Sequence, residues 1–176
     1  MNIPVVLPVK SHIQKFIVTR YGTGSTNEIS VRKMTFLGDM LSLALVKDPL
    51  MTTSFQMPTG PILIFQYPTE TKFLSLPKHN VKSLQMALDR HFRDTLITFV
   101  TGYHYATGNQ MQAVKKFLEI HQINDDELTA DTAWKIWRDF ESKKERQRTK
   151  IFRKDVGSIR QVVGELGNSS VIFAIS

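Results

Sequence analysis

The sequence predicts an α+β protein. A small antiparallel or mixed sheet with two helices forms the first half, and a mainly helical second half carries a basic helix and a short C-terminal strand. Three observations predict this class. Short β-branched and aromatic runs bounded by proline and glycine lie mostly in the first half. From residue 80 onward, apolar residues recur every three to four positions. A basic run with almost no apolar residue follows at 143–150.

In the first half, the predicted elements alternate between strands and helices. Residues 3–9 read as an edge strand, because two prolines remove hydrogen-bond donors from it. Ser11 is expected to cap a helix that buries Phe16 and its apolar neighbours. A second helix over 30–46 is expected to bury Met34. The remaining elements are strands at 55–57, 61–68 and 73–76.

In the second half, a long helix begins at Asn80 and is expected to end near Gly102. Asn109 caps the next helix. The segment 124–127 resembles an N-cap followed by its acid three residues on, and it is expected to open the helix that runs into the basic run. That helix should bury Ala133, Ile136, Trp137 and Phe140.

The tail is expected to be broken by three glycines and to end in a strand at 171–175. The glycines are Gly157, Gly164 and Gly167. This pattern suggests an α+β region at 1–78, a helical region at 79–160 and a tail at 161–176. One continuous core across these regions stays an open alternative, because the predicted loops are short.

The charge of the chain is concentrated in one segment. The formal net charge is +7, yet residues 1–134 carry a balance of only +2 and residues 161–176 carry −1. The 26 residues 135–160 hold ten bases against four acids. A basic segment of this kind indicates a polyanionic partner, because phosphates relieve its self-repulsion.

The segments around this basic end resemble a known module. Residues 108–114, 117–119, 123–128 and 132–138 resemble the helix-turn-helix modules of small phage and mobile-element DNA-binding proteins. The resemblance implies DNA binding in transcription regulation or a related process. The turn departs from the pattern because it lacks the usual glycine. The N-terminal end of the second helix carries acids that phosphates would repel, which makes its opposite end the better candidate for DNA contact.

The sequence contains few residues that would support catalysis, metal binding or cofactor binding. Cysteine is absent, which excludes disulfides, thiolate metal sites and cysteine nucleophiles. No two histidines have the spacing of a helical zinc site, and residues 22–26 lack the lysine of a phosphate-binding loop. We therefore expect no catalytic residue, metal or cofactor. We also expect no membrane association and a cytoplasmic location, since no apolar run is long enough to span a bilayer and the first residues lack a signal-peptide pattern.

The leading hypothesis is a non-enzymatic protein that binds nucleic acid, DNA rather than RNA, through the basic helix. Base-reading residues are not assigned, although residues 146–148 form a suggestive cluster. Two alternatives stay open: a structural or assembly protein that makes protein contacts, with a homodimer among them, and an enzyme acting on nucleic acid. The candidate contact residues are Lys143, Lys144, Arg146, Arg148, Lys150, Arg153 and Lys154.

Overall fold

The α+β class is confirmed by the computed structural model. Its contacts divide the chain into two units, Met1–Ile136 and Trp137–Ser176, which are described separately. For residues 152–168 only the backbone is described. The regions expected from the sequence, with boundaries after residues 78 and 160, stay a prediction. The structure describes residues 1–22, 27–48, 58–71 and 73–168.

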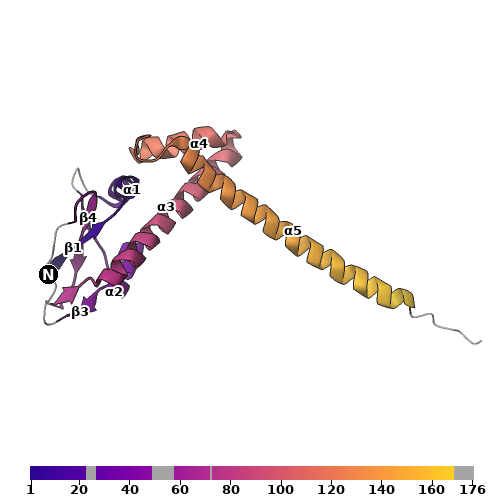
Figure 1. Cartoon of the computed structure of the whole chain (residues 1–176), viewed down its shortest axis with the longest axis horizontal. Helices are drawn as coiled ribbons and strands as arrows, with labels where there is room; N and C mark the ends of the chain where they lie inside the picture. Colours follow the sequence, from indigo (N-terminus) through magenta and orange to yellow (C-terminus); the bar gives the residue numbers. More distant parts are fainter. Residues whose placement is uncertain (23–26, 49–57, 72, 169–176) are drawn as a thin grey trace, which may run out of the picture. The chain divides into compact units, whose positions relative to one another are not determined.

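The first unit contains a mixed three-stranded sheet and a small two-stranded one (Figure 1). In the larger sheet, β4 (Ile62–Pro68) lies between β1 (Asn2–Pro8), which runs antiparallel to it, and β2 (Glu28–Ser30), which runs parallel. The smaller sheet pairs β3 (Val46–Lys47) with β5 (Leu74–Ser75) in antiparallel fashion. The strand predicted at 55–57 lies outside the described residues.

Strand β1 is an edge strand, as predicted. The Val9 amide donates to the carbonyl of Pro61 and the Thr69 amide donates to that of Met1, both at 3.0 Å. Antiparallel hydrogen bonding alternates along a strand. The backbone N–H and C=O groups of the odd-numbered residues of β1 therefore point toward β4, and those of the even-numbered residues point toward the free edge. Two of those even positions, Pro4 and Pro8, have no N–H. The free edge of β1 therefore offers few donors to an added strand.

Five helices complete the described chain: α1 (Ser11–Tyr21), α2 (Phe36–Ala44), α3 (Lys78–Thr107), α4 (Gln110–Ile120) and α5 (Ala130–Asn168). In the first unit, α1, α3 and α4 meet at Phe16, which is fully buried. Its ring centroid lies 5.3 Å from that of Phe92 on α3 and 6.2 Å from that of Phe117 on α4. The prediction that α1 buries Phe16 is confirmed. The prediction that Ser11 caps α1 is wrong, because Lys10 precedes the first turn and the Ser11 hydroxyl donates to Glu127 instead.

The helix predicted over 30–46 is shorter than expected. Ser30 belongs to β2, and the amide of Val31 donates to the carbonyl of Gln66 on β4 at 3.1 Å. Helix α2 begins only at Phe36, after a cap by the Thr35 hydroxyl. The β-branched start of this segment completes the sheet instead of a helix. Met34, expected in the core, is 96% exposed.

The third helix is longer than predicted. Helix α3 continues past Gly102 and ends at Thr107, where Gly108 takes a left-handed conformation with φ of 73°. A glycine inside a helix costs about 1 kcal/mol relative to alanine, which a 30-residue helix tolerates. The cap predicted at Asn109 is confirmed, since its side chain accepts from the Gln112 amide at 3.0 Å.

Helix α5 begins later and ends later than predicted. Thr129, rather than the segment 124–127, precedes its first turn, and the Thr129 hydroxyl accepts from the Thr132 amide at 3.2 Å. The helix then continues through Gly157, Gly164 and Gly167, so the break predicted there is wrong. The strand predicted at 171–175 lies outside the described residues.

Candidate nucleic-acid interface

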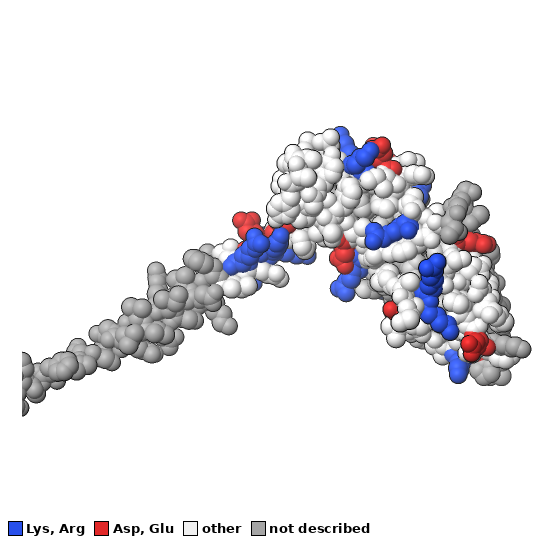
Figure 2. All heavy atoms as spheres, turned by 180° about the vertical axis from the view of Figure 1, so that it is seen from behind, with Lys and Arg blue, Asp and Glu red and all other residues white. Residues whose placement is uncertain are grey.

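The basic segment of the second unit lies on α5. Lysine, arginine, glutamine and glutamate are good helix formers, and they continue the helix beyond the apolar residues that begin this unit. Figure 2 shows basic side chains gathered on α5 next to the residues drawn in grey. With almost no apolar residue, this part of the helix leaves its charges in solvent.

Four of the seven candidate residues are exposed and form no ion pair with a described side chain. Lys143, Arg146, Arg148 and Lys150 are all exposed. Among the residues whose side chains are described, none of the four makes an ion pair within 4.0 Å. Each of these side chains can therefore meet a phosphate without first breaking an ion pair to a described residue.

Lys144 differs from these four. Its Nζ lies 3.4 Å from the Glu141 carboxylate and 6.0 Å from the ring centroid of Phe140, and its side chain is only 34% exposed. Lys144 is thus held by its own helix. The remaining two candidates, Arg153 and Lys154, lie on the described backbone of α5, but their side chains are outside the described residues.

The two aromatic residues of α5 that were expected in the core differ in their burial. Trp137 is buried, with 7% of its surface exposed, which confirms the prediction. Phe140 is 39% exposed, so the prediction that it is a core residue is wrong. Phe140 lies three residues beyond Trp137, where the side chains that follow on the helix are polar.

The charges of α5 are sorted around the helix axis. At about 100° per residue, Arg146, Lys150 and Lys143 fall within roughly 60° of one another. The exposed acid Glu145 lies on the opposite side, together with the partly exposed Glu141. Arg148 lies at the border of the acidic side. The result is a basic face with two acids behind it, while the exposed Asp139, which pairs with Arg138, falls on the basic side.

A shallow, open depression lies on this part of α5. It is lined by Arg146, Lys150, Thr149, Ser142 and Glu145. Lysine, arginine and hydroxyl side chains are the usual donors to phosphate oxygens in DNA complexes. The Thr149 hydroxyl donates to the backbone carbonyl of Glu145 at 3.0 Å and keeps its lone pairs for another donor. The depression therefore combines two cations and two hydroxyls with one carboxylate, that of Glu145.

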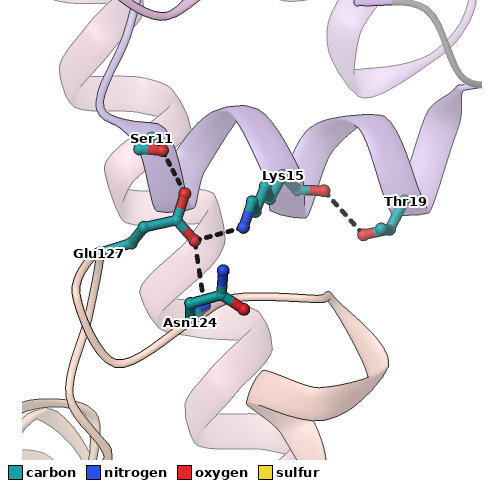
Figure 3. Close-up of polar contacts among 5 residues, drawn as sticks. All are labelled: Ser11, Lys15, Thr19, Asn124 and Glu127. Carbon is teal, nitrogen blue, oxygen red and sulfur yellow. Dashed lines mark hydrogen bonds and ion pairs between the residues drawn. The ribbon is translucent and has the colours of Figure 1, made fainter.

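The acidic turn of the first unit has a structural role that the sequence did not reveal. The Glu127 carboxylate accepts hydrogen bonds from the Ser11 hydroxyl, from the Lys15 ammonium at 2.6 Å and from the backbone amide of Asn124 at 3.0 Å (Figure 3). Its side chain is only 10% exposed. Burial raises the pKa of Glu127, but these hydrogen bonds and the charge of Lys15 outweigh burial and lower it from 4.5 to about 2. Glu127 therefore fixes α1 to the turn.

Two histidines fix α1 in the same way. The Tyr21 hydroxyl lies 2.7 Å from His91 Nε2 on α3, and the Thr19 hydroxyl lies 2.7 Å from Nδ1 of His121, just after α4. Burial first, and then the charge of Arg20, lowers the pKa of both imidazoles. These side chains already have partners inside the first unit, which gives them a packing role.

The described residues were also compared with the requirements for a metal site and for a membrane-spanning helix. Within that part of the chain, no group of three or more His, Cys, Asp or Glu side chains could hold a metal ion. None of the helices in the same residues is long and apolar enough to cross a bilayer.

No protein-family model, curated protein or solved structure matches this chain.

Proposed function

We propose that this protein binds duplex DNA through the basic face of α5, without catalysing a reaction. The observation that supports the proposal best is the set of four exposed bases, Lys143, Arg146, Arg148 and Lys150, none of which pairs with a described acid. Their mutual repulsion is a cost in the free protein. Phosphates remove that cost and release counterions, which drives binding.

The rest of the helix supports the same proposal. Glu141 and Glu145 lie on the side of α5 away from Lys143, Arg146 and Lys150, and the exposed Asp139 at the start of this unit is paired with Arg138. The acidic turn at Glu127 belongs to the first unit and is engaged with Ser11 and Lys15. The exposed acids Asp125 and Asp126 precede α5 and carry no part of the proposed contact.

The assembly alternative has less support. Assembly by strand exchange between copies would need exposed edge strands, for which residues 3–9 and 171–175 are the candidates. In β1 the free edge carries Pro4 and Pro8, which cannot donate to an added strand. The second candidate strand, at 171–175, lies outside the described residues.

The test is a salt titration of binding to a labelled 20-base-pair duplex, measured by fluorescence anisotropy. The triple variant Lys143→Glu, Arg146→Glu, Lys150→Glu should bind on the order of 100-fold more weakly at 50 mM salt than wild type. The slope of log K against log salt should fall by roughly 2.7, because about 0.9 is lost for each phosphate contact.

A matched control carries the same change of charge on the first unit. The variant Lys82→Glu, Lys115→Glu, Lys116→Glu replaces three exposed lysines on α3 and α4. It should keep most of the affinity and most of the salt slope. If both triple variants lose affinity equally, net charge alone explains the binding. If wild type binds no duplex at 50 mM salt, the proposed function is wrong, and an acidic protein becomes the better partner to test.

A further inference from the structure

Two uncharged residues lie inside the basic surface of α5. Gln147 is exposed, and Ile151 is 62% exposed. At about 100° per residue, they fall roughly 40° and 80° from Lys143, and Arg148 lies about 60° beyond Ile151. Gln147 and Ile151 are therefore flanked by Lys143 on one side and by Arg148 on the other.

The flanking charges suit the two walls of a groove. Lys143, Arg146 and Lys150 would reach the phosphates of one strand, and Arg148 would reach those of the other. Glu145 lies about 160° from Gln147 around the helix axis and would face away from DNA, whereas Glu141 lies about 20° from Arg148, two turns earlier on the helix, and pairs with Lys144. The residues between the two basic edges would then face the floor of the groove.

An α-helix fits the major groove of B-form DNA, which is about 12 Å wide and displays a distinct pattern for each base pair. A glutamine amide can bond N6 and N7 of adenine at the same time, and an aliphatic side chain can contact the methyl group of thymine. The major groove of duplex RNA is too deep and narrow for side chains to read. Four residues of helix rise about 6 Å, so Gln147 and Ile151 would reach neighbouring base pairs.

We infer that α5 enters the major groove of duplex DNA, where Gln147 and Ile151 read A·T base pairs. This inference rests on the proposed function, and it adds the groove, the base pairs and the two specificity-determining residues. The basic residues would supply affinity without sequence preference, whereas Gln147 and Ile151 would supply the preference.

The experiment selects binding sites from a duplex library with a randomised 12-base-pair core, and then measures affinity for the enriched sequence and for a scrambled duplex. Wild type should enrich adenine and thymine at neighbouring positions. Gln147→Ala should lose roughly 5- to 150-fold of the discrimination, the range expected for one bidentate contact, with affinity for the scrambled duplex unchanged. Gln112→Ala, on α4, is the matched control and should keep the discrimination in full.

The proposed contact between Ile151 and a thymine methyl group is tested by changing the DNA. Replacing thymine with deoxyuridine in the enriched sequence removes only the methyl group. This change should weaken wild-type binding roughly fourfold, the amount expected for one buried methyl group, and should have no effect on Ile151→Ala.

The outcomes separate this inference from the proposed function. Salt-dependent duplex binding without sequence preference would overturn the inference and leave the proposed function intact. A preference that survives both Gln147→Ala and Ile151→Ala would also overturn it, as would equal binding to duplex RNA of the same sequence. If no duplex is bound at all, the proposed function itself is wrong.

Discussion

The two units differ in how the charges discussed above are paired. In the first unit, Glu127 is buried against α1 and takes part in three polar contacts, one of them with Lys15. In the second unit, Lys143, Arg146 and Lys150 are exposed and pair with no described acid. Paired charges hold a fold together, whereas unpaired charges of one sign are available for a partner. Substitutions in the two units should therefore separate stability from binding.

The largest loss of stability is expected at the aromatic centre of the first unit. Phe16 is fully buried against Phe92 and Phe117. Phe16→Ala should lower the free energy of unfolding by about 3–5 kcal/mol, measured by urea denaturation. Tyr105→Ala is the control, because Tyr105 is 82% exposed, and it should change stability by less than about 0.5 kcal/mol. Equal losses in both variants would contradict the assignment of this core.

The next effect is expected at Glu127. Glu127→Ala leaves Lys15 and Ser11 without their acceptor and should cost about 2 kcal/mol. Glu119→Ala, which removes a surface ion pair with Lys116, should cost about 0.5 kcal/mol or less. Because the pKa of Glu127 is lowered, its contribution is complete above pH 4.5 and is lost as the pH falls toward 2. A wild-type and a variant acid-unfolding curve of the same shape would contradict this role.

A smaller effect is expected from the histidines. Lowered pKa values mean that the folded state binds fewer protons than the unfolded chain. Stability should therefore fall as the pH drops below 6.5, and the fall should be weaker in His91→Gln and His121→Gln. The described side chains of the second unit include no histidine, so DNA affinity between pH 6 and 8 should stay constant. An affinity that follows the stability curve would link the two units.

The smallest effect on stability is expected from the charge reversal on α5. The triple variant Lys143→Glu, Arg146→Glu, Lys150→Glu changes residues that touch no core and pair with no described acid. Its free energy of unfolding should lie within about 0.5 kcal/mol of wild type. Thermal melting measures this directly. A large loss would show that these residues support the fold. The weaker DNA binding of the variant would then be explained by unfolding and not by lost phosphate contacts.

Much of the fold follows from local patterns in the sequence. The prolines of β1 identify an edge strand, the apolar period of α4 identifies its buried face, and Asn109 identifies its cap. The start of α2 is different, because residues 28–30 form a strand only through pairing with β4. Such pairing is tertiary and leaves little local signal in three residues.

The candidate interface was also only partly predictable. The exposure of Lys143, Arg146 and Lys150 follows from the lack of apolar neighbours. The partner of Lys144 could have been found, because Glu141 lies three residues before it, a spacing at which side chains meet on a helix. The contacts of Glu127 with Ser11 and Lys15 could not, since nothing local relates residues more than one hundred positions apart.

The sequence separation of these contacts affects how the chain folds during synthesis. Ser11 and Glu127 lie 116 residues apart, and Thr19 and His121 lie 102 apart. At roughly 5–20 residues per second, a ribosome delivers Glu127 about 6–20 s after Ser11. Throughout that interval α1 has its apolar face but neither of these polar partners. The first helix to be synthesised is therefore one of the last to be fixed, and nascent chains that stop before the acidic turn should expose it to proteases.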